Sequence, residues 1–388
     1  VSIGDEAFMN SSIKRIDIPS SVTVLSNKAF AELKNVEEII LHESLSSIGK
    51  GVFYHSSLPK SIEIPSSVKI IGDEAFSGIK NVDEVILHEG LDSIGNDAFG
   101  GSSIKKINIP STVTKLGKYI LSGTDLQEFD WPENLHTIPY GCFLGSKIKR
   151  FDFTHIKEIE SSAFFYCEFL EEVVIPRGCR IGSWAFESSK IKLFTFEELP
   201  EDIPLSSDNR IFIDEYAFAY SEWESKRIVL PRGLGIGRRA FMDCESVQTI
   251  EIHDDVWFSW FMIFCGEMDA YDSSKVLPTW IPDSIIYLAD NPMVQPDIFQ
   301  DVMYRESTLY VKPEALEKVK NTYPWKYFRK IEVLSSGIDD IPVDTDDEEN
   351  DSELFYNLEG IPCGSDRKVL APGIYILRKN GKTSKIVI

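Results

Sequence analysis

The chain has 388 residues, of which 43% are hydrophobic and 26% charged, and these values are typical of a folded globular protein. Its net charge of −22 argues against binding to nucleic acid or to anionic membrane surfaces, because both require clustered lysine and arginine. No apolar stretch reaches the roughly 20 residues that cross a bilayer, so we expect no membrane insertion.

A repeat fills the first two thirds of the chain. Its marker, Ile-Gly-x-x-Ala-Phe, first appears at Ile3, and the phenylalanine or a degenerate copy recurs every 21 to 23 residues with one gap of 32. The marker positions are Phe8, Phe30, Phe53, Phe76, Phe99, Leu121, Phe143, Phe164, Phe186, Phe218 and Phe241. Between markers, Ile16 and Ile18 alternate with polar residues before Pro19, which indicates a short strand buried on one face.

These features predict a leucine-rich-repeat-type β-rich solenoid over residues 1–252, with a parallel sheet and about 11 coils of 22–23 residues. Residues 1–8 already lie inside a repeat, so we expect the natural protein to continue upstream. The gap of 32 places an insertion of about ten residues within 195–210. Its segment Glu197–Pro204 is expected to project from a coil, as a contact loop or as tolerated decoration.

One copy of the repeat, Ile64–Phe76, reads Ile-Pro-Ser-Ser-Val-Lys-Ile-Ile-Gly-Asp-Glu-Ala-Phe. This pattern resembles the BspA-type leucine-rich repeats of bacterial surface proteins, and the resemblance covers residues 1–252 with degenerate copies after residue 115. Proteins of this kind are generally exported and some act as adhesins. The resemblance therefore implies an extracellular or outer-surface location and a host protein or glycan as ligand, including extracellular matrix.

The residue pairs before the second inward position of each predicted strand alternate in charge from coil to coil. They are Lys14-Arg15, Glu37-Glu38, Lys60-Ser61, Asp83-Glu84, Lys105-Lys106, Gln127-Glu128, Lys149-Arg150 and Glu171-Glu172. In a parallel sheet these residues are lateral neighbours, so each basic coil lies between acidic ones and the pairs stabilise the register. We call this pattern the charge ladder.

From His253 the marker is no longer recognisable, and residues 253–334 are predicted to form an α/β capping region with a short helix over Glu314–Asn321. Residues 335–351 form an acidic stretch that is interpreted as a linker. The alternative is a calcium loop, in which Glu349 would occupy the position that requires glycine.

Residues 352–388 are predicted to form a small β tail, in which Asn380-Gly381 is a strong hairpin signal. The sequence around Gly360 and Gly373–Leu377 is similar to the C-terminal sorting domains of type IX secretion. The alternative is a small β module that merely packs on the cap.

No sequence motif indicates catalysis, a cofactor or a metal site. His42 and His88 recur at one place in coils two apart, as do acidic pairs, and such repetition indicates duplication rather than a single site. Cysteines show no metal-binding spacing. Cys167 and Cys244 each follow a marker phenylalanine by three residues, which favours buried packing at a coil corner over disulfides.

The aromatic cluster Trp257, Phe258, Trp260 and Phe261 is the candidate binding patch, suited to stacking on sugars or anchoring a protein. Its alternative interpretation is core at the junction between array and cap.

We therefore expect a secreted or cell-surface, non-enzymatic and monomeric binding scaffold without a cofactor. Two alternatives remain open: a structural spacer that presents an upstream domain, and a hydrolase with its site within residues 253–300.

Overall fold

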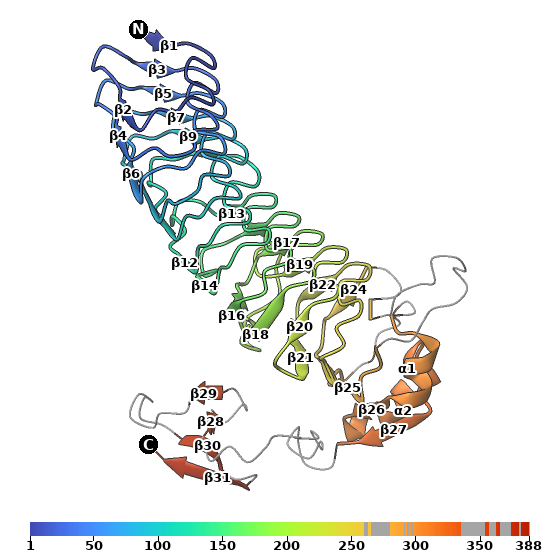
Figure 1. The fold of residues 1–388 in the computed structure, drawn as a ribbon. Coiled ribbons are helices and arrows are strands. Elements are labelled where there is room, and N and C mark those ends of the chain that lie inside the picture. The colour runs from blue at the N-terminus through green and yellow to red at the C-terminus, as the bar shows by residue number, and fades with distance from the viewer. Residues whose placement is uncertain are drawn as a thin grey trace, which may run out of the picture. The chain divides into compact units, whose positions relative to one another are not determined.

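The computed structural model describes residues 1–259, 263–264, 280–290, 292, 295 and 298–334, together with the backbone of four strands between 354 and 387. The chain forms two compact units, Val1–Leu334 and Ser335–Ile388. The first unit is a stack of coils (Figure 1) in which all the paired strands are parallel. It is the parallel β-solenoid that the sequence predicts, with about 14 turns rather than 11.

Each regular coil contributes two short strands, on two different sides of the stack, where the sequence predicted one. The first side carries strands that precede or contain the first residues of the marker. They are β1 (Ser2–Ile3), β3 (Val24–Leu25), β5 (Ser47–Ile48), β7 (Ile70–Ile71), β9 (Ser93–Ile94), β11 (Lys115–Leu116), β13 (Thr137–Ile138), β15 (Glu158–Ile159), β17 (Arg180–Ile181), β19 (Ile211–Ile213), β22 (Leu234–Ile236) and β24 (Trp257–Phe258). We call this side the marker face.

The second side carries the strands that the alternating isoleucines predict, and in β2 only Ile16 of the three residues is buried. The strands are β2 (Arg15–Asp17), β4 (Glu38–Ile40), β6 (Ser61–Glu63), β8 (Glu84–Ile86), β10 (Lys106–Ile107), β12 (Glu128–Phe129), β14 (Arg150–Phe151), β16 (Leu170–Ile175), β18 (Lys190–Phe196), β20 (Glu222–Trp223), β21 (Arg227–Leu230), β23 (Thr249–Ile252), β25 (Ser284–Tyr287), β26 (Thr308–Val311) and β27 (Lys330–Val333). We call this side the ladder face.

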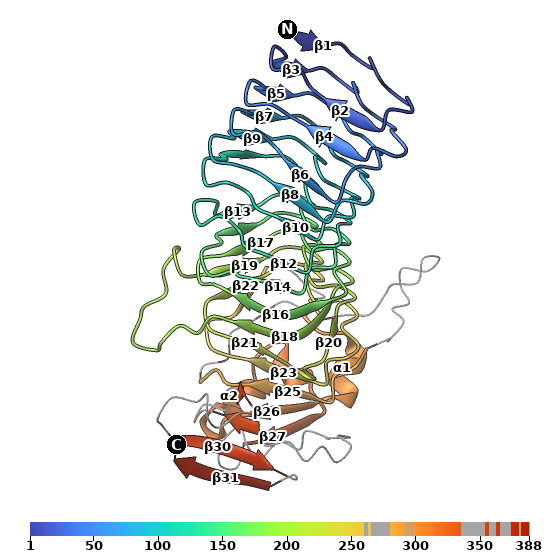
Figure 2. The same ribbon diagram turned by 60° about the vertical axis from the view of Figure 1, so that its left-hand side comes forward.

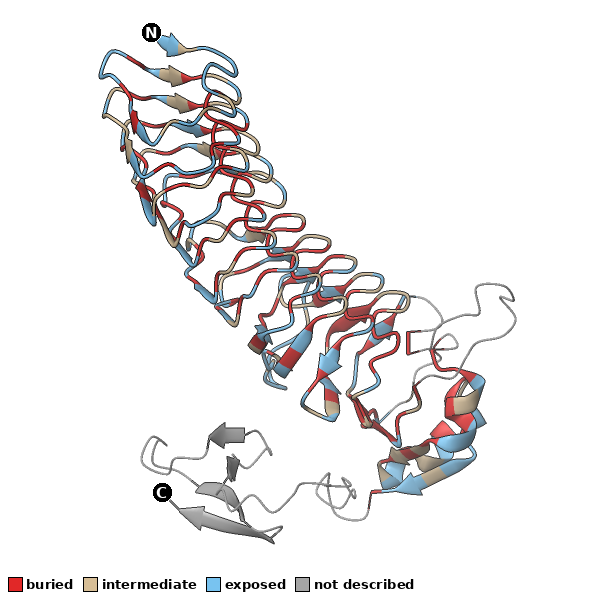
Figure 3. Ribbon diagram, viewed as in Figure 1, coloured by how far each residue is buried: buried red, intermediate tan, exposed pale blue. Residues whose placement is uncertain are grey.

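A column of stacked phenylalanine rings forms the centre of the core, and buried residues follow it from coil to coil (Figure 3). From Phe8 to Phe99, and again from Phe143 to Phe241, successive marker rings stack with centroids 5.1–5.8 Å apart. Leu121 interrupts the column. Because offset stacking adds to the burial of each ring, the column both fills the core and aligns the coils.

The sequence marker is lost after residue 252, but the stack of coils continues beyond the range that the sequence predicted for the solenoid. The ring of Phe264 stacks on Phe241 with centroids 5.6 Å apart, and Phe299 stacks on Phe264 at 5.4 Å. Strands β25, β26 and β27 extend the ladder face in register. The pattern was hidden because an aromatic residue, Phe258, fills the inward position that Ile236 fills in the preceding coil.

In these last coils, short helices replace the corner turns of the regular repeat. They are α1 (Asp301–Glu306), the 3-10 turn η1 (Pro313–Ala315), α2 (Leu316–Val319) and the 3-10 turn η2 (Trp325–Tyr327). The helix expected over Glu314–Asn321 thus consists of η1 followed by α2. Trp325 of η2 is fully buried and its ring stacks on Tyr287 of β25, with centroids 4.0 Å apart.

Small hydrogen-bonding residues line one buried corner of the coils, three residues after the marker. Ser189 Oγ donates to the carbonyl of Phe164 at 2.6 Å, in the preceding coil. Cys167 and Cys244 occupy the same place, and their thiols donate to the carbonyls of Phe143 and Phe218 at 3.1 and 3.2 Å. The prediction that these two cysteines are buried corner residues is confirmed.

The charge ladder is also confirmed. Arg15 pairs with Glu38 across β2 and β4, and Arg150 lies between Glu128 and Glu171. The pairs with N–O distances of 2.7–3.2 Å are Lys14–Glu37, Arg15–Glu38, Lys60–Asp83, Lys105–Asp83 and Lys106–Glu84. Hydrogen bonds from Lys105 and Lys60 lower the pKa of Asp83.

The insertion forms a loop between β18 and β19, visible in yellow-green in Figure 2, where it stands out from the stack. Arg232 ties it back, because its guanidinium donates to the carbonyls of Glu201 and Ile203 at 3.0 and 2.6 Å. Ile203 at the loop is 42% exposed.

The second unit contains the strands β28 (Leu354–Tyr356), β29 (Pro362–Gly364), β30 (Ile374–Lys379) and β31 (Lys382–Val387). They form an antiparallel sheet in which Lys379 lies opposite Lys382. The linker predicted over 335–351 and the turn residues Asn380 and Gly381 lie outside the described residues.

Candidate functional site

The structure separates the residues of the aromatic cluster. Phe258 is 3% exposed and belongs to the core, whereas Trp257 is 51% exposed on the marker face. The two differ because successive side chains of β24 point to opposite sides of the strand. Trp260 and Phe261 lie outside the described residues.

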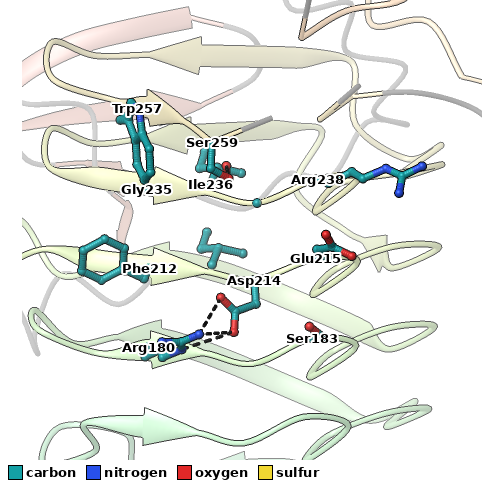
Figure 4. A pocket seen from close by; sticks show the side chains of 12 residues that line it. Arg180, Ser183, Phe212, Asp214, Glu215, Gly235, Ile236, Arg238, Trp257 and Ser259 are labelled. Atoms are coloured by element: carbon teal, nitrogen blue, oxygen red, sulfur yellow. Dashed lines mark hydrogen bonds and ion pairs between the residues drawn. The ribbon is translucent and has the colours of Figure 1, made fainter. Parts of the chain in front are cut away.

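Trp257 ends a row of side chains that runs across the marker face. Through the parallel register of β17, β19, β22 and β24, the row contains Arg180, Phe212, Gly235 and Trp257 in successive coils. Figure 4 shows the rings of Phe212 and Trp257 on the strands that flank Gly235. Phe212 is 40% exposed, so both rings meet solvent.

The absence of a side chain at Gly235 lets the two rings lie close against the strand between them. A Cβ atom at this residue would lie 2.9 Å from a ring carbon of Phe212 and 3.3 Å from one of Trp257. The first distance is shorter than a van der Waals contact, so a side chain here would displace the phenylalanine ring. A hollow of about 390 Å³ is lined by both rings and also by Gly235, Ile213 and Ile236.

Polar side chains surround the hollow. The guanidinium of Arg180 donates to both carboxylate oxygens of Asp214, with bonds of 2.9 and 3.2 Å (Figure 4). The remaining polar side chains that line the hollow are Ser183, Glu215, Arg238 and Ser259. Two arginines and two carboxylates balance in charge, so the rim offers donors and acceptors without a large net field.

A second hollow of about 790 Å³ lies on the ladder face. Its lining is dominated by charged side chains around Phe169, which is 45% exposed. Lys190 and Glu222 form an ion pair at 3.0 Å there, and the hydrogen bond that Lys190 donates to Glu222 raises the pKa of Lys190. This surface continues the charge ladder and shows no feature that sets it apart from the neighbouring coils.

Ionisable side chains do pair in the part of the chain that the structure describes, as at buried Glu251, whose carboxylate contacts both Arg227 and His253. No cluster of three or more histidine, cysteine, aspartate or glutamate side chains there could hold a metal ion. His42 Nε2 and His88 Nε2 instead lie 3.4 and 2.9 Å from carboxylate oxygens of Asp17 and Glu63, each in the preceding coil.

The thiols of the described cysteines are buried. Burial raises the pKa of Cys142 well above its ordinary value, and that of Cys167 and Cys179 to about 12. These groups are therefore protonated at neutral pH, whereas a thiol nucleophile acts as the thiolate.

None of the described helices has the length and apolar character that crossing a bilayer demands.

Arg180, Phe212, Asp214 and Gly235 were not singled out in the sequence. A signal for the row was present, because Arg180, Phe212, Gly235 and Trp257 each stand directly before an inward residue of the marker face. Neighbouring coils place that position side by side. The row becomes visible only when the strands of the marker face are aligned in register, and the repeat pattern alone did not predict these strands.

The fold is that of a leucine-rich-repeat solenoid whose marker face carries a solvent-exposed hollow. The sequence profile of the BspA type leucine rich repeat region matches six copies over residues 1–127, 93–207 and 211–259. The chain therefore belongs to the family of BspA-type leucine-rich-repeat proteins. No curated protein sequence matches it.

Solved structures with a similar fold come from several bacteria. The pneumococcal vaccine antigen PcpA is 19% identical over 86% of this chain and 85% of its own, with a TM-score of 0.53. A leucine-rich cell surface protein of Faecalibacterium prausnitzii is 20% identical over 66% and 77%, with a TM-score of 0.40. A leucine-rich-repeat protein of Bacteroides ovatus is 18% identical over 86% and 87%, with a TM-score of 0.41.

Proposed function

We propose that this protein is a non-enzymatic binding scaffold, secreted or displayed on the outer cell surface, that engages a host protein or glycan through its extended faces as a monomer. The observation that carries the proposal is the in-register row of exposed side chains on each face, exemplified by Arg180–Phe212–Gly235–Trp257. Such rows offer a partner many contacts over successive coils.

Two further observations support this proposal. The net charge of −22 disfavours nucleic acid and anionic lipid as partners. A structure that shares the fold, with a TM-score of 0.53, is described as a pneumococcal vaccine antigen, which accords with exposure at a cell surface.

The test compares single substitutions with removal of whole coils. Binding of the full chain to immobilised extracellular-matrix protein is measured for His42→Ala, Glu37→Gln and Glu171→Gln, and for a chain lacking residues 31–76. The three substitutions should leave the Kd within about twofold, whereas the deletion should weaken binding in proportion to the area removed. Turnover of a glycoside, peptide or ester that one acidic substitution abolishes would overturn the proposal.

The same proposal assigns export to the C-terminal unit, as in type IX sorting domains. Because Ser335–Ile388 forms a compact unit separate from Val1–Leu334, its removal should leave the solenoid folded. A chain ending at Leu334 should then accumulate inside the producing cell with the Tm of the full chain. Normal export of this shortened chain would refute the sorting role.

A further inference from the structure

We propose that the hollow between Phe212 and Trp257 is a glycan-binding site that takes a neutral hexopyranose unit. This inference rests on the proposed function and specifies one ligand class and one place on the marker face. It is carried by the two exposed rings, the glycine between them and the balanced polar rim.

The two rings supply an apolar contact surface suited to a pyranose. Phe212 and Trp257 are 40% and 51% exposed, and Gly235 between them lets both rings lie close against the strand. One face of a pyranose ring presents C–H groups with partial positive charge, which fit the negative face of an aromatic ring. The hollow of about 390 Å³ falls within the roughly 300–1,000 Å³ of small-ligand sites.

The rim supplies both the hydrogen-bond donors and the hydrogen-bond acceptors that sugar hydroxyls require. Asp214 uses its carboxylate oxygens for Arg180 at 2.9 and 3.2 Å, but a carboxylate has about four acceptor positions, so capacity remains for a ligand. Ser259 Oγ donates to the carbonyl of Ile236 at 3.0 Å, which leaves its lone pairs directed away from that bond. Arg238 and Glu215 add a donor and an acceptor at the same rim.

The rim also distinguishes a sugar from the proline-rich peptide that other aromatic grooves bind. Such a peptide offers carbonyl acceptors but few N–H donors, so it would supply no donors to the remaining acceptor positions of the Asp214 and Glu215 carboxylates. Acceptor positions left unfilled beneath a ligand are costly. Each sugar hydroxyl both donates and accepts, and therefore matches carboxylates and guanidinium groups together.

The test uses the full chain and defined probes in titration calorimetry. The probes are hexaoses of β-1,3-glucose, β-1,4-glucose, α-1,4-glucose and β-1,4-mannose, with decaproline as the competing class. At least one hexaose should bind, and Phe212→Ala and Trp257→Ala should each weaken it tenfold or more. Tyr166→Ala is the matched control, because Tyr166 is 54% exposed and lies outside the hollow, and it should bind as the unaltered chain does.

Gly235→Ala gives a second measurement that removes neither ring. Its added methyl group would meet the Phe212 ring at 2.9 Å, so the ring must move and hexaose binding should again fall tenfold or more, with the Tm little changed. The proposal is overturned if no hexaose binds, if Phe212→Ala and Trp257→Ala bind as well as Tyr166→Ala, or if only decaproline binds. If matrix-protein binding persists in those cases, the proposed scaffold function stands and the glycan site alone fails.

Discussion

Phe186 and Phe218 stack with ring centroids 5.1 Å apart and planes inclined by 2°, although 32 residues separate them in the chain. Phe164 and Phe186, only 22 residues apart, stack at the same distance and angle. The insertion between β18 and β19 therefore leaves the column undisturbed, because its extra residues leave the coil as a loop.

Deleting residues 198–207 should consequently preserve cooperative unfolding, with a Tm within a few degrees of the full chain. The side-chain hydrogen bonds that this deletion removes include those from Arg232 to two loop carbonyls and those between Asn209 and the loop, all at exposed positions. Deleting residues 160–169 instead removes Phe164 from the column and should abolish the cooperative transition. Thermal unfolding followed by circular dichroism checks both; similar damage from the two deletions would mean that the loop belongs to the core.

Within the column, the cost of losing a ring should follow its burial. Phe164 is fully buried, so Phe164→Ala should reduce the free energy of unfolding by about 3–5 kcal/mol. Phe8 is 40% exposed, so Phe8→Ala should cost less than half as much. Urea unfolding of both variants measures the difference, and equal losses would contradict a burial-driven column.

The charge ladder predicts that coils are removed more safely in pairs. Deleting residues 31–76 joins Phe30 to Ser77 and places Asp83-Glu84 beside Lys14-Arg15, which keeps opposite charges adjacent. Deleting residues 31–53 removes a single coil and brings Lys60 beside Lys14-Arg15. Although it keeps more of the array, the single-coil deletion should have the lower Tm at low salt.

Salt identifies the cause of that difference. At about 0.01 M salt the Debye length is about 30 Å, and at about 1 M it is about 3 Å, so the repulsion should largely vanish at the higher concentration. If the single-coil variant has a Tm at low salt equal to or above that of the two-coil variant, the charge ladder does not determine the register of the coils.

Acid should weaken the solenoid through two carboxylates that bind the corner of the next coil. Hydrogen bonds from Ser66 and Ser67 lower the pKa of Glu43, and those from Ser111 and Thr112 lower the pKa of Glu89, each from an ordinary value of 4.5. A carboxylate whose pKa is lowered on folding stabilises the folded state at any pH above its unfolded-state pKa. This stabilisation is lost as the pH falls through the folded-state pKa.

The double variant Glu43→Gln, Glu89→Gln should therefore be less stable than the parent at pH 7 and lose less stability between pH 5 and pH 3. Ser66→Ala with Ser111→Ala, which removes the side-chain donors instead, should flatten the same part of the profile. The urea midpoints of the variants and the parent are compared across that pH range. Parallel pH profiles would show that Glu43 and Glu89 do not cause the loss of stability in acid.

Serine variants of two buried cysteines should lose different amounts of stability. In Cys167→Ser the hydroxyl can keep the bond to the carbonyl of Phe143, as Ser189 does one coil later, so the cost should stay below about 1 kcal/mol. Cys142 stands where other coils have the alanine of the marker, and it is fully buried. Cys142→Ser would bury a hydroxyl there and should cost about 1–3 kcal/mol by urea unfolding. Equal costs would contradict the role of the corner hydrogen bond.

Much of the fold could be predicted from the sequence, because the spacing of the marker predicts which side chains point into the core. The ring column, the strands around Ile16 and the charge ladder all follow from that spacing. The coils after residue 252 could not be predicted in the same way, since Phe258 replaces an isoleucine and 35 residues separate Phe264 from Phe299. The three-dimensional stack tolerates such changes as long as an apolar side chain fills the column.

The candidate site was less accessible to sequence reasoning. Trp257 was selected for its aromatic neighbours, but Phe258 proved to be core, and the partners of Trp257 lie 22 and 45 residues earlier, at Gly235 and Phe212. Only the lateral register of the marker face brings these residues together. A glycine flanked by two aromatic residues has meaning only once the coils are stacked.

The main-chain hydrogen bonds between coils have a mechanical consequence. Each coil donates to the next, as Phe30 N does to Val52 O at 2.9 Å and Phe53 N to Ala75 O at 2.8 Å, so these bonds run along the length of the stack. A force that pulls the solenoid from its two ends acts on these interfaces in series, so the interfaces open one at a time. The array should therefore lengthen stepwise under tension, releasing about 22–23 residues of chain per step, and so limit the load that reaches whatever it binds.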